Sequence, residues 1–258
     1  MDNWNPNKYL QFKNERTQPA IDLVEKIDIN EPTNIIDIGC GPGNSTQILI
    51  NKWPNSMVIG LDSSINMIEK ARKDYPYQMW IHDNAENIHD DKKYSIVFSN
   101  ASLQWMEDHK VLIPKLWKIV SDNGVFAAQI PKFETMPINS AIQNVLRKEL
   151  WEKSIKNNFW ANKTLRNLDY YYEIFSTFTE EIIVWETHYF HILPSMQGII
   201  DFIHSTALKP YLEELKTDKE KQKFENDILK ECRKYYKEQS DGKVLFPFKR
   251  MFMIAYKN

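Results

Sequence analysis

The sequence predicts an α/β protein with a doubly wound, mostly parallel sheet of seven strands and inserted lid helices. Up to residue 131, short β-branched runs alternate with amphipathic segments, the pattern of parallel strands joined by crossover helices. After Pro131, helical segments dominate, and two strand-like segments interrupt them. Three of the chain's seven glycines fall together after the first predicted strand, where an open α/β sheet binds its ligand.

The first five strands are predicted from apolar runs that are too short for a helix of about ten residues. Glycine, proline or polar residues bound these runs, as expected where a strand ends. The five strands are expected at 34–38, 56–61, 77–82, 94–98 and 125–130.

The segments between these strands carry helix signals. Ser45 and Thr46 stand where a helix begins, either Ser63 or Ser64 caps the next one, and Asp122-Asn123-Gly124 forms a turn before the fifth strand. The helices are expected at 44–52, from Ser63 or Ser64 to Tyr75, and at 108–120.

The second half is expected to complete the sheet and to cover its carboxyl edge. Helices are predicted at 137–160, 195–206 and 217–239, the last with a capping box formed by Thr217 and Glu220. We expect one domain with the following parts: a helical cap at 1–30, a core at 31–131, lid insertions at 132–180 and 191–243, and closing strands at 181–190 and 244–257.

Composition excludes several classes of function. The 258 residues are 42% apolar and 26% charged with a net charge of -2, so the chain is neither disordered nor broadly attracted to nucleic acid or an anionic membrane. No apolar run approaches the roughly 20 residues of a membrane span, and the N-terminus lacks a signal-peptide pattern. We expect a cytoplasmic protein. Cys40 and Cys232 are too few and too far apart for a disulfide framework or a CxxC metal motif.

Four strand ends predict an adenosine-containing ligand. The glycine loop, Asp37-Ile38-Gly39-Cys40-Gly41-Pro42-Gly43, ends the first strand, so its backbone can approach a ligand closely. Asp62 ends the second strand, where a carboxylate accepts hydrogen bonds from ribose hydroxyls. Asp83-Asn84-Ala85 and Ser99-Asn100 follow the next two strands. A tight turn and a charge at a helix N-terminus are the alternatives for the first two features.

These motifs together resemble those of class I S-adenosylmethionine-dependent methyltransferases. The resemblance implies S-adenosylmethionine as cofactor, with Gly39 and Gly41 near its methionine moiety, Asp62 on the ribose, and Asn100 at the methionine end. The adenine would then lie against Asp83 and Ala85. The implied cofactor-binding residues are Gly39, Cys40, Gly41, Asp62, Ser63, Asp83, Asn84, Ala85 and Asn100.

A closer resemblance, to the trans-aconitate methyltransferase family, extends from residue 4 to about residue 256. Ala207 and Lys209 depart from this pattern, since the family usually has Gly and Arg there. The matching blocks are Trp4-Asn5-Pro6, Tyr9-Leu10, Glu15-Arg16-x-x-Pro19-Ala20, Gly41 to Thr46, Asn100 to Trp105, Tyr171-Tyr172-x-Ile174, Pro194-Ser195-x-Gln197-x-Ile199-Ile200-Asp201 and Arg250-x-Phe252.

The reaction implied by the resemblance is methyl transfer to a carboxylate of trans-aconitate, giving a monomethyl ester. A carboxyl group is already ionised at neutral pH, so we predict no proton-transfer residue and no metal, and catalysis by positioning and exclusion of water. The candidate acceptor-binding residues are Arg16, Trp105, His191, Lys209 and Arg250.

Each acceptor candidate has an alternative role. Arg16 could hold the cofactor's carboxylate, Trp105 could be a core aromatic, and a lone histidine such as His191 is more often structural. Cys40 has no basic neighbour in the loop, so it is interpreted as a small packing residue.

Three alternative functions stay open at this stage. They are a methyltransferase for another small carboxylic acid, a nicotinamide-dependent oxidoreductase, and a cofactor-binding protein without turnover. The glycine spacing, G-x-G-x-G rather than G-x-G-x-x-G, disfavours the oxidoreductase.

Overall fold

The computed structural model describes residues 12–89, 91–157, 159–162 and 166–258. The chain forms two compact units. We call Met1–Pro131, Arg166–Thr187 and Arg250–Asn258 the sheet unit, and Lys132–Leu165 and His188–Lys249 the helical unit. The sequence blocks at residues 4–10 lie outside the described residues. Among the described helices, none is both long and apolar enough to cross a membrane.

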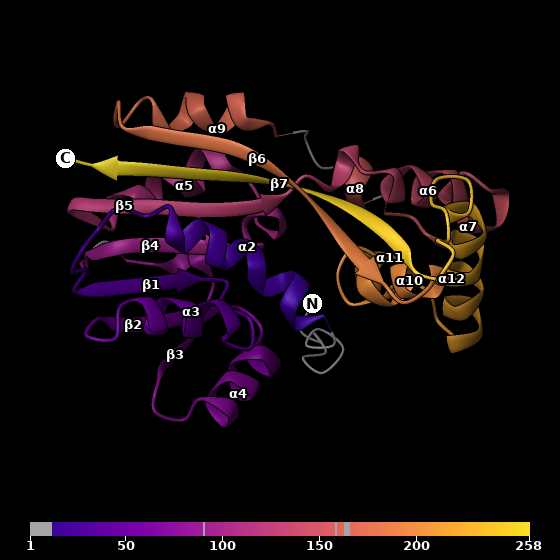
Figure 1. Cartoon of the computed structure of the whole chain (residues 1–258), viewed down its shortest axis with the longest axis horizontal. Helices are drawn as coiled ribbons and strands as arrows, with labels where there is room; N and C mark the ends of the chain where they lie inside the picture. Colours follow the sequence, from indigo (N-terminus) through magenta and orange to yellow (C-terminus); the bar gives the residue numbers. More distant parts are fainter. Residues whose placement is uncertain (1–11, 90, 158, 163–165) are drawn as a thin grey trace. The chain divides into compact units, whose positions relative to one another are not determined.

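The sheet confirms the predicted fold class. Seven strands are ordered β3-β2-β1-β4-β5-β7-β6, and the pairs among β1 to β5 are parallel whereas β7 runs antiparallel to β5 (Figure 1). The reversal of strand order beside β1 is the topological switch point at which such sheets bind ligands. The strands are β1 (Asn34–Ile38), β2 (Met57–Asp62), β3 (Met79–His82), β4 (Tyr94–Asn100), β5 (Val120–Pro131), β6 (Ile182–Leu193) and β7 (Val244–Lys257).

β5 begins earlier than predicted. Tyr94 pairs with Val120 and Ile96 with Val125, so the residues in between bulge from the ladder. Asn123 lies in this bulge and has a φ of 58°. This value is in the left-handed region, which asparagine tolerates better than most residues. The expected turn at 122–124 is therefore an irregular part of the strand.

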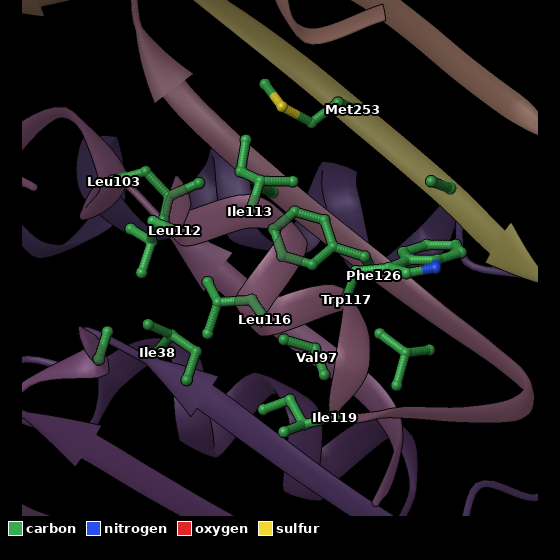
Figure 2. Close-up of a cluster of buried hydrophobic side chains, with 14 of the residues drawn as sticks. Ile38, Val97, Leu103, Leu112, Ile113, Leu116, Trp117, Ile119, Phe126 and Met253 are labelled. Carbon is green, nitrogen blue, oxygen red and sulfur yellow. The ribbon is translucent and has the colours of Figure 1, made fainter. Parts of the chain in front are cut away.

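Helices of the sheet unit cover both faces of the sheet. Leu112 and Leu116 of α5 belong to one buried cluster with Val97 and Phe126, and Figure 2 shows these side chains together. Ile36 of β1 belongs to the same cluster, so strand alternation places its neighbour Ile35 on the opposite face of the sheet. Ile35 is also fully buried. The helix α2 packs against α3 and β5. The helices are α2 (Lys13–Glu25), α3 (Asn44–Lys52), α4 (Ile65–Asp74), α5 (His109–Lys118) and α9 (Leu168–Phe175), with 3-10 turns η1 (Ala85–Asn87) and η2 (Leu103–Trp105).

The helix α9 lies in the sheet unit, although it falls in the segment 132–180 that we expected to form a lid insertion. Tyr171, Ile174 and Phe175 of this helix are buried in the same cluster as the α5 side chains. The apolar face of α9 therefore contributes to the core of the sheet unit.

The helical unit has its own apolar core, in which α12 packs against α6 and α10. The Trp151 ring meets Phe224 edge to face with centroids 5.0 Å apart, and the indole N–H donates to Asp227 Oδ2 at 2.9 Å. The capping box of Thr217 and Glu220 is confirmed. The elements are η3 (Phe133–Thr135), α6 (Pro137–Leu146), α7 (Glu149–Ser154), α8 (Phe159–Asn162), α10 (Met196–His204), α11 (Lys209–Leu212) and α12 (Asp218–Cys232).

Two helix predictions in this unit were too long. The helix predicted at 137–160 ends at Leu146, because Lys148 adopts an extended conformation between α6 and α7. The helix predicted at 217–239 ends at Cys232. Periodicity continued past both breaks and masked them.

Candidate active site

The glycine loop after β1 is bound to the end of β2. The backbone N–H groups of Gly39 and Cys40 donate to the Leu61 carbonyl oxygen at 2.7 and 3.0 Å. Gly39 has a φ of +71°, and a Cβ there would lie 1.7 Å from Ser102 Oγ. Only glycine fits this position, so the close packing of the loop on the segment after β4 depends on it.

Gly41 presents its backbone to open space, and its N–H holds the acid at the end of β2. A Cβ built on Gly41 would meet no atom within 4 Å. The Gly41 N–H donates to Asp62 Oδ2 at 2.8 Å, and the Ser64 N–H donates to Oδ1 at 2.8 Å. Burial raises the pKa of Asp62, and these two donors oppose the rise. Both carboxylate oxygens are thus oriented, and each retains a lone pair for a ligand hydroxyl.

Asp37 lies buried beneath the loop. Its Oδ2 accepts hydrogen bonds from Ser45 Oγ at 2.6 Å and from Thr46 Oγ1 at 2.7 Å. Burial raises the pKa of Asp37 to about 6, against the effect of the two hydroxyls. Ser45 and Thr46 lie near the start of α3, as expected, but Gly43 is the N-cap, and the two hydroxyls stabilise the Asp37 carboxylate.

Cys40 packs inside this region. Its side chain is buried beside Trp80 and Ile68, and burial raises the pKa of the thiol well above its usual value. A Cβ on the neighbouring Gly60 would lie 2.9 Å from Cys40 Sγ and 2.4 Å from the Trp80 ring. This tight packing agrees with the interpretation of Cys40 as a small residue rather than a thiolate.

The third strand end carries a structured acidic turn. Asp83 Oδ1 accepts from the Asn84 N–H at 2.7 Å and from Asn87 Nδ2 at 2.8 Å, and the Asn87 amide is the main cause of its lowered pKa. Asp83 is exposed and Ala85 is buried. Beside them, the Ser63 carbonyl accepts a hydrogen bond of 3.0 Å from His82 Nε2. Ser64, the N-cap of α4, makes no side-chain capping bond.

The fourth strand end holds an amide without a partner. Asn100 Oδ1 is buried and accepts no hydrogen bond from the part of the chain that the structure describes. The next residue, Ala101, has a φ of +52°, a conformation that costs about 1–3 kcal/mol in residues other than glycine. Such strain and an unpaired buried acceptor are typical of ligand sites.

The residues at these strand ends fit S-adenosylmethionine. The open backbone of Gly41 leaves room for a ligand at the loop, and the oriented Asp62 carboxylate suits a pair of ribose hydroxyls. The unpaired acceptor Asn100 Oδ1 suits the ammonium group at the methionine end.

Three of the five acceptor candidates belong to the sheet unit. Arg16 is buried in α2, Trp105 ends η2, and Arg250 is buried in β7. Arg250 Nη1 donates to Gln129 Oε1 at 3.1 Å. Sequence reasoning missed Gln129, which is fully buried at the carboxyl end of β5. Its only signal is a polar residue within an apolar strand.

The other two candidates belong to the helical unit. The His191 ring is buried, 5.2 Å from the Phe202 ring and 5.6 Å from that of Phe248 by centroids, contacts that favour a packing role. Lys209 begins α11, and its ammonium lies 3.6 Å from Glu213 Oε1.

Comparison with known proteins identifies the class. Residues 35–124 match the family described as "Methyltransferase domain". The YcgJ protein of Bacillus subtilis has a similar fold, with a TM-score of 0.58 at 12% identity over 93% of this chain and 99% of that one. Phosphoethanolamine N-methyltransferase 2 of Haemonchus contortus, solved with S-adenosylmethionine, gives 0.60 at 13% identity over 98% of this chain and 57% of that one. The protein is a class I methyltransferase, and its cofactor is S-adenosylmethionine.

Full-length relatives define the family further. Trans-aconitate 2-methyltransferase of Yersinia pseudotuberculosis is 33% identical over 256 residues, 99% of each chain. That of Escherichia coli O157:H7 is 34% identical over 255 residues, 99% of this chain and 98% of the relative. The chain belongs to the trans-aconitate 2-methyltransferase family. Membership removes the nicotinamide-dependent oxidoreductase as an alternative.

Proposed function

We propose that the protein transfers a methyl group from the sulfonium of S-adenosylmethionine to a carboxylate oxygen of trans-aconitate. The O–CH3 bond forms as the S–CH3 bond breaks, and the products are the monomethyl ester and S-adenosylhomocysteine. The observation that carries this proposal is the extent of the similarity to trans-aconitate 2-methyltransferases. It covers 256 residues and therefore includes both units, not only the residues 35–124 that many methyltransferases share.

The cofactor residues proposed from the sequence are those at the four strand ends, Gly39, Cys40, Gly41, Asp62, Ser63, Asp83, Asn84, Ala85 and Asn100. When bound, S-adenosylmethionine supplies an electrophilic methyl group on a sulfonium. In this proposal Gly41 admits the ligand close to the backbone, and Asp62 accepts hydrogen bonds from the ribose. The buried Asn100 Oδ1 orients the methionine end. Cys40 lies within the loop without taking part in chemistry.

The acceptor carboxylate needs orientation rather than deprotonation. A carboxyl group with a pKa near about 4 is ionised at neutral pH, so no side chain has to remove a proton. Placing its oxygen in line with the methyl group can supply roughly 7–11 kcal/mol of the rate acceleration. We assign the orientation to cations, foremost Arg250, whose guanidinium is fixed by Gln129.

Several finer assignments belong to the same proposal. Arg16 and Lys209 serve as further cations for the acceptor, and Trp105 forms an apolar wall. His191 is retained as a weaker candidate because its contacts are those of a packing residue. We also propose that the inserted helices act as a lid that excludes water. The positive sulfonium and the negative carboxylate neutralise each other during methyl transfer, and a site without water favours that step.

The proposed partner is a small carboxylic acid, without nucleic acid or membrane, and the proposed location is the cytoplasm. Both cysteines, Cys40 and Cys232, are free and buried, which agrees with a reducing compartment. Fractionation of cells that produce the protein tests the location.

A second candidate function follows from one observation. By the resemblance stated from the sequence, Lys209 stands where the family usually has arginine, and lysine binds carboxylates as a point charge rather than in a bidentate fork. A different di- or tricarboxylic acid could therefore be the preferred acceptor.

The test incubates the protein with methyl-labelled S-adenosylmethionine and a panel of di- and tricarboxylic acids, and measures base-labile methyl ester. We expect trans-aconitate to have the highest kcat/KM. A different best acid supports the second candidate. Tight cofactor binding without ester from any acid would contradict both and leave a cofactor-binding protein without turnover.

A further inference from the structure

Gln129 is a fully buried polar side chain in the apolar part of β5. Its neighbours Ala128 and Ile130 in β5 are buried, and Gln129 itself is 0% exposed. A primary amide carries an acceptor oxygen and two N–H donors, and burial is unfavourable unless these groups are hydrogen bonded. Such a residue is therefore expected to have a function at this place.

The chemistry of its partner determines which way the amide points. Arg250 Nη1 donates to Gln129 Oε1 at 3.1 Å. Because a guanidinium has only donors, the amide oxygen must face Arg250, and the NH2 group must point elsewhere. Gln129 Nε2 is buried, and no residue that the structure describes accepts a hydrogen bond from it. The protein thus holds a preoriented N–H donor beside a cation, and none of the described residues offers that donor an acceptor.

The position of Gln129 is the ligand-binding edge of the sheet. Gln129 pairs in register with Asn100 of the parallel neighbour β4, whose Oδ1 is likewise buried without a hydrogen bond. Gln104 adds a third unpaired buried amide atom, Oε1, since its Nε2 donates to the Ala101 carbonyl at 2.7 Å. Unpaired buried polar atoms at the carboxyl ends of β4 and β5, and in the turn η2 that follows β4, point to a ligand.

We propose that Gln129 binds and positions the carboxylate that accepts the methyl group, acting together with Arg250. Its Oε1 fixes the guanidinium, and its Nε2 donates to a carboxylate oxygen of the acceptor. This inference rests on the proposed function, because it takes the acceptor to be a carboxylic acid. A neutral N–H donor beside a cation favours an anionic group that only accepts hydrogen bonds. An ammonium group only donates hydrogen bonds, so this donor cannot bind it. S-adenosylmethionine also carries a carboxylate, and the experiment separates the two sources.

The discriminating substitution is Gln129→Glu. Glutamate keeps an acceptor for Arg250 but replaces the N–H donor by a negative charge. If Gln129 only supports Arg250, Gln129→Glu is harmless and Gln129→Met, which removes the Arg250 acceptor, is harmful. If Nε2 binds the acceptor, Gln129→Glu is the more damaging change. Gln239→Glu, on an exposed turn, is the matched control for the added charge.

Two measurements are made on each variant: titration calorimetry of trans-aconitate in the presence of S-adenosylhomocysteine, and of S-adenosylmethionine alone. For Gln129→Glu we expect the dissociation constant for trans-aconitate to rise about 10- to 100-fold. The dissociation constant for S-adenosylmethionine should stay within about twofold of the wild-type value. Thermal unfolding should match the wild type. If Gln129→Glu does not fold, Gln129→Met tests which ligand is bound: weaker trans-aconitate binding with unchanged S-adenosylmethionine binding supports the inference, and unchanged trans-aconitate binding overturns it.

Three results would overturn the inference. The first is unchanged trans-aconitate binding in Gln129→Glu, and the second is a loss confined to S-adenosylmethionine, which would assign the donor to the cofactor's carboxylate. The third is that the wild type binds no acid of the carboxylate panel. Failure of the proposed function is separate, because it would appear as absence of methyl ester from the wild-type protein, whereas the first two results require only binding.

Discussion

The backbone N–H of Gly41 donates a hydrogen bond of 2.8 Å to Asp62 Oδ2, which joins the glycine loop after β1 to the acid at the end of β2. The hydrogen bond orients the carboxylate, while the missing side chain of Gly41 leaves the space beside it open. Gly41 thus orients Asp62, the residue proposed to bind the ribose, and also leaves room for the cofactor.

Gly41→Ala tests that role against a matched control. Gly41 and Gly242 both have positive φ values, +56° and +80°, and a Cβ on either meets no atom within 4 Å. Alanine should therefore cost a similar free energy of unfolding at both positions, about 1–2 kcal/mol. Only Gly41→Ala should weaken S-adenosylmethionine binding, by about tenfold or more, as measured by calorimetry. Equal cofactor affinity in the two variants would refute close approach at Gly41.

Asp37 should make stability depend on pH. Its pKa is raised by burial from 3.8 to about 6 in the folded protein, so the folded chain binds this proton more tightly than the unfolded chain. The stabilisation is fully present below about pH 4 and is lost as the pH rises to about 6.

Asn at this position does not titrate and can still accept from Ser45 and Thr46. The free energy of unfolding of Asp37→Asn minus that of the wild type should therefore rise by about 2 kcal/mol between about pH 4.5 and about pH 7.5. Urea unfolding of both proteins without cofactor, from about pH 4.5 to about pH 7.5, measures the difference. A difference that is independent of pH would show that Asp37 is already ionised throughout.

Thr217→Ala should weaken the helical unit alone. Thr217 Oγ1 accepts from the Glu220 N–H at 3.2 Å at the start of α12, and loss of such an N-cap costs about 1 kcal/mol. Urea unfolding should report this loss, while the dissociation constant for S-adenosylmethionine stays at the wild-type value. A weaker affinity for the cofactor would mean that α12 supports the cofactor site.

The strand and loop pattern of the sheet unit could be predicted because it depends on local signals. The β1 bounds Asn34–Ile38 and the α3 bounds Asn44–Lys52 agree with the prediction, since a short apolar run, three glycines and Trp53-Pro54 delimit them. The break at Lys148 was missed because its extended backbone interrupts an apolar periodicity that continues on both sides.

The contacts of the site were less predictable because they join distant residues. Ser45 and Thr46 have the types of residue found at helix starts, and only the fold brings their hydroxyls to Asp37. The Gln129–Arg250 contact joins residues 121 positions apart, and a single glutamine in a strand has no spacing pattern. Buried polar residues of this kind require the strand register.

The central claim is that different residues bind the two ligands: those at the strand ends, including Asp62, bind the cofactor, and Gln129 and Arg250 bind the acceptor. Measuring both affinities in two variants tests it. Dissociation constants for S-adenosylmethionine and for trans-aconitate, the latter with S-adenosylhomocysteine present, are measured for Asp62→Ala and Arg250→Ala. We expect Asp62→Ala to weaken cofactor binding by about 10- to 100-fold and to spare the acceptor, and Arg250→Ala to do the reverse. Equal losses of both ligands in both variants would contradict the account.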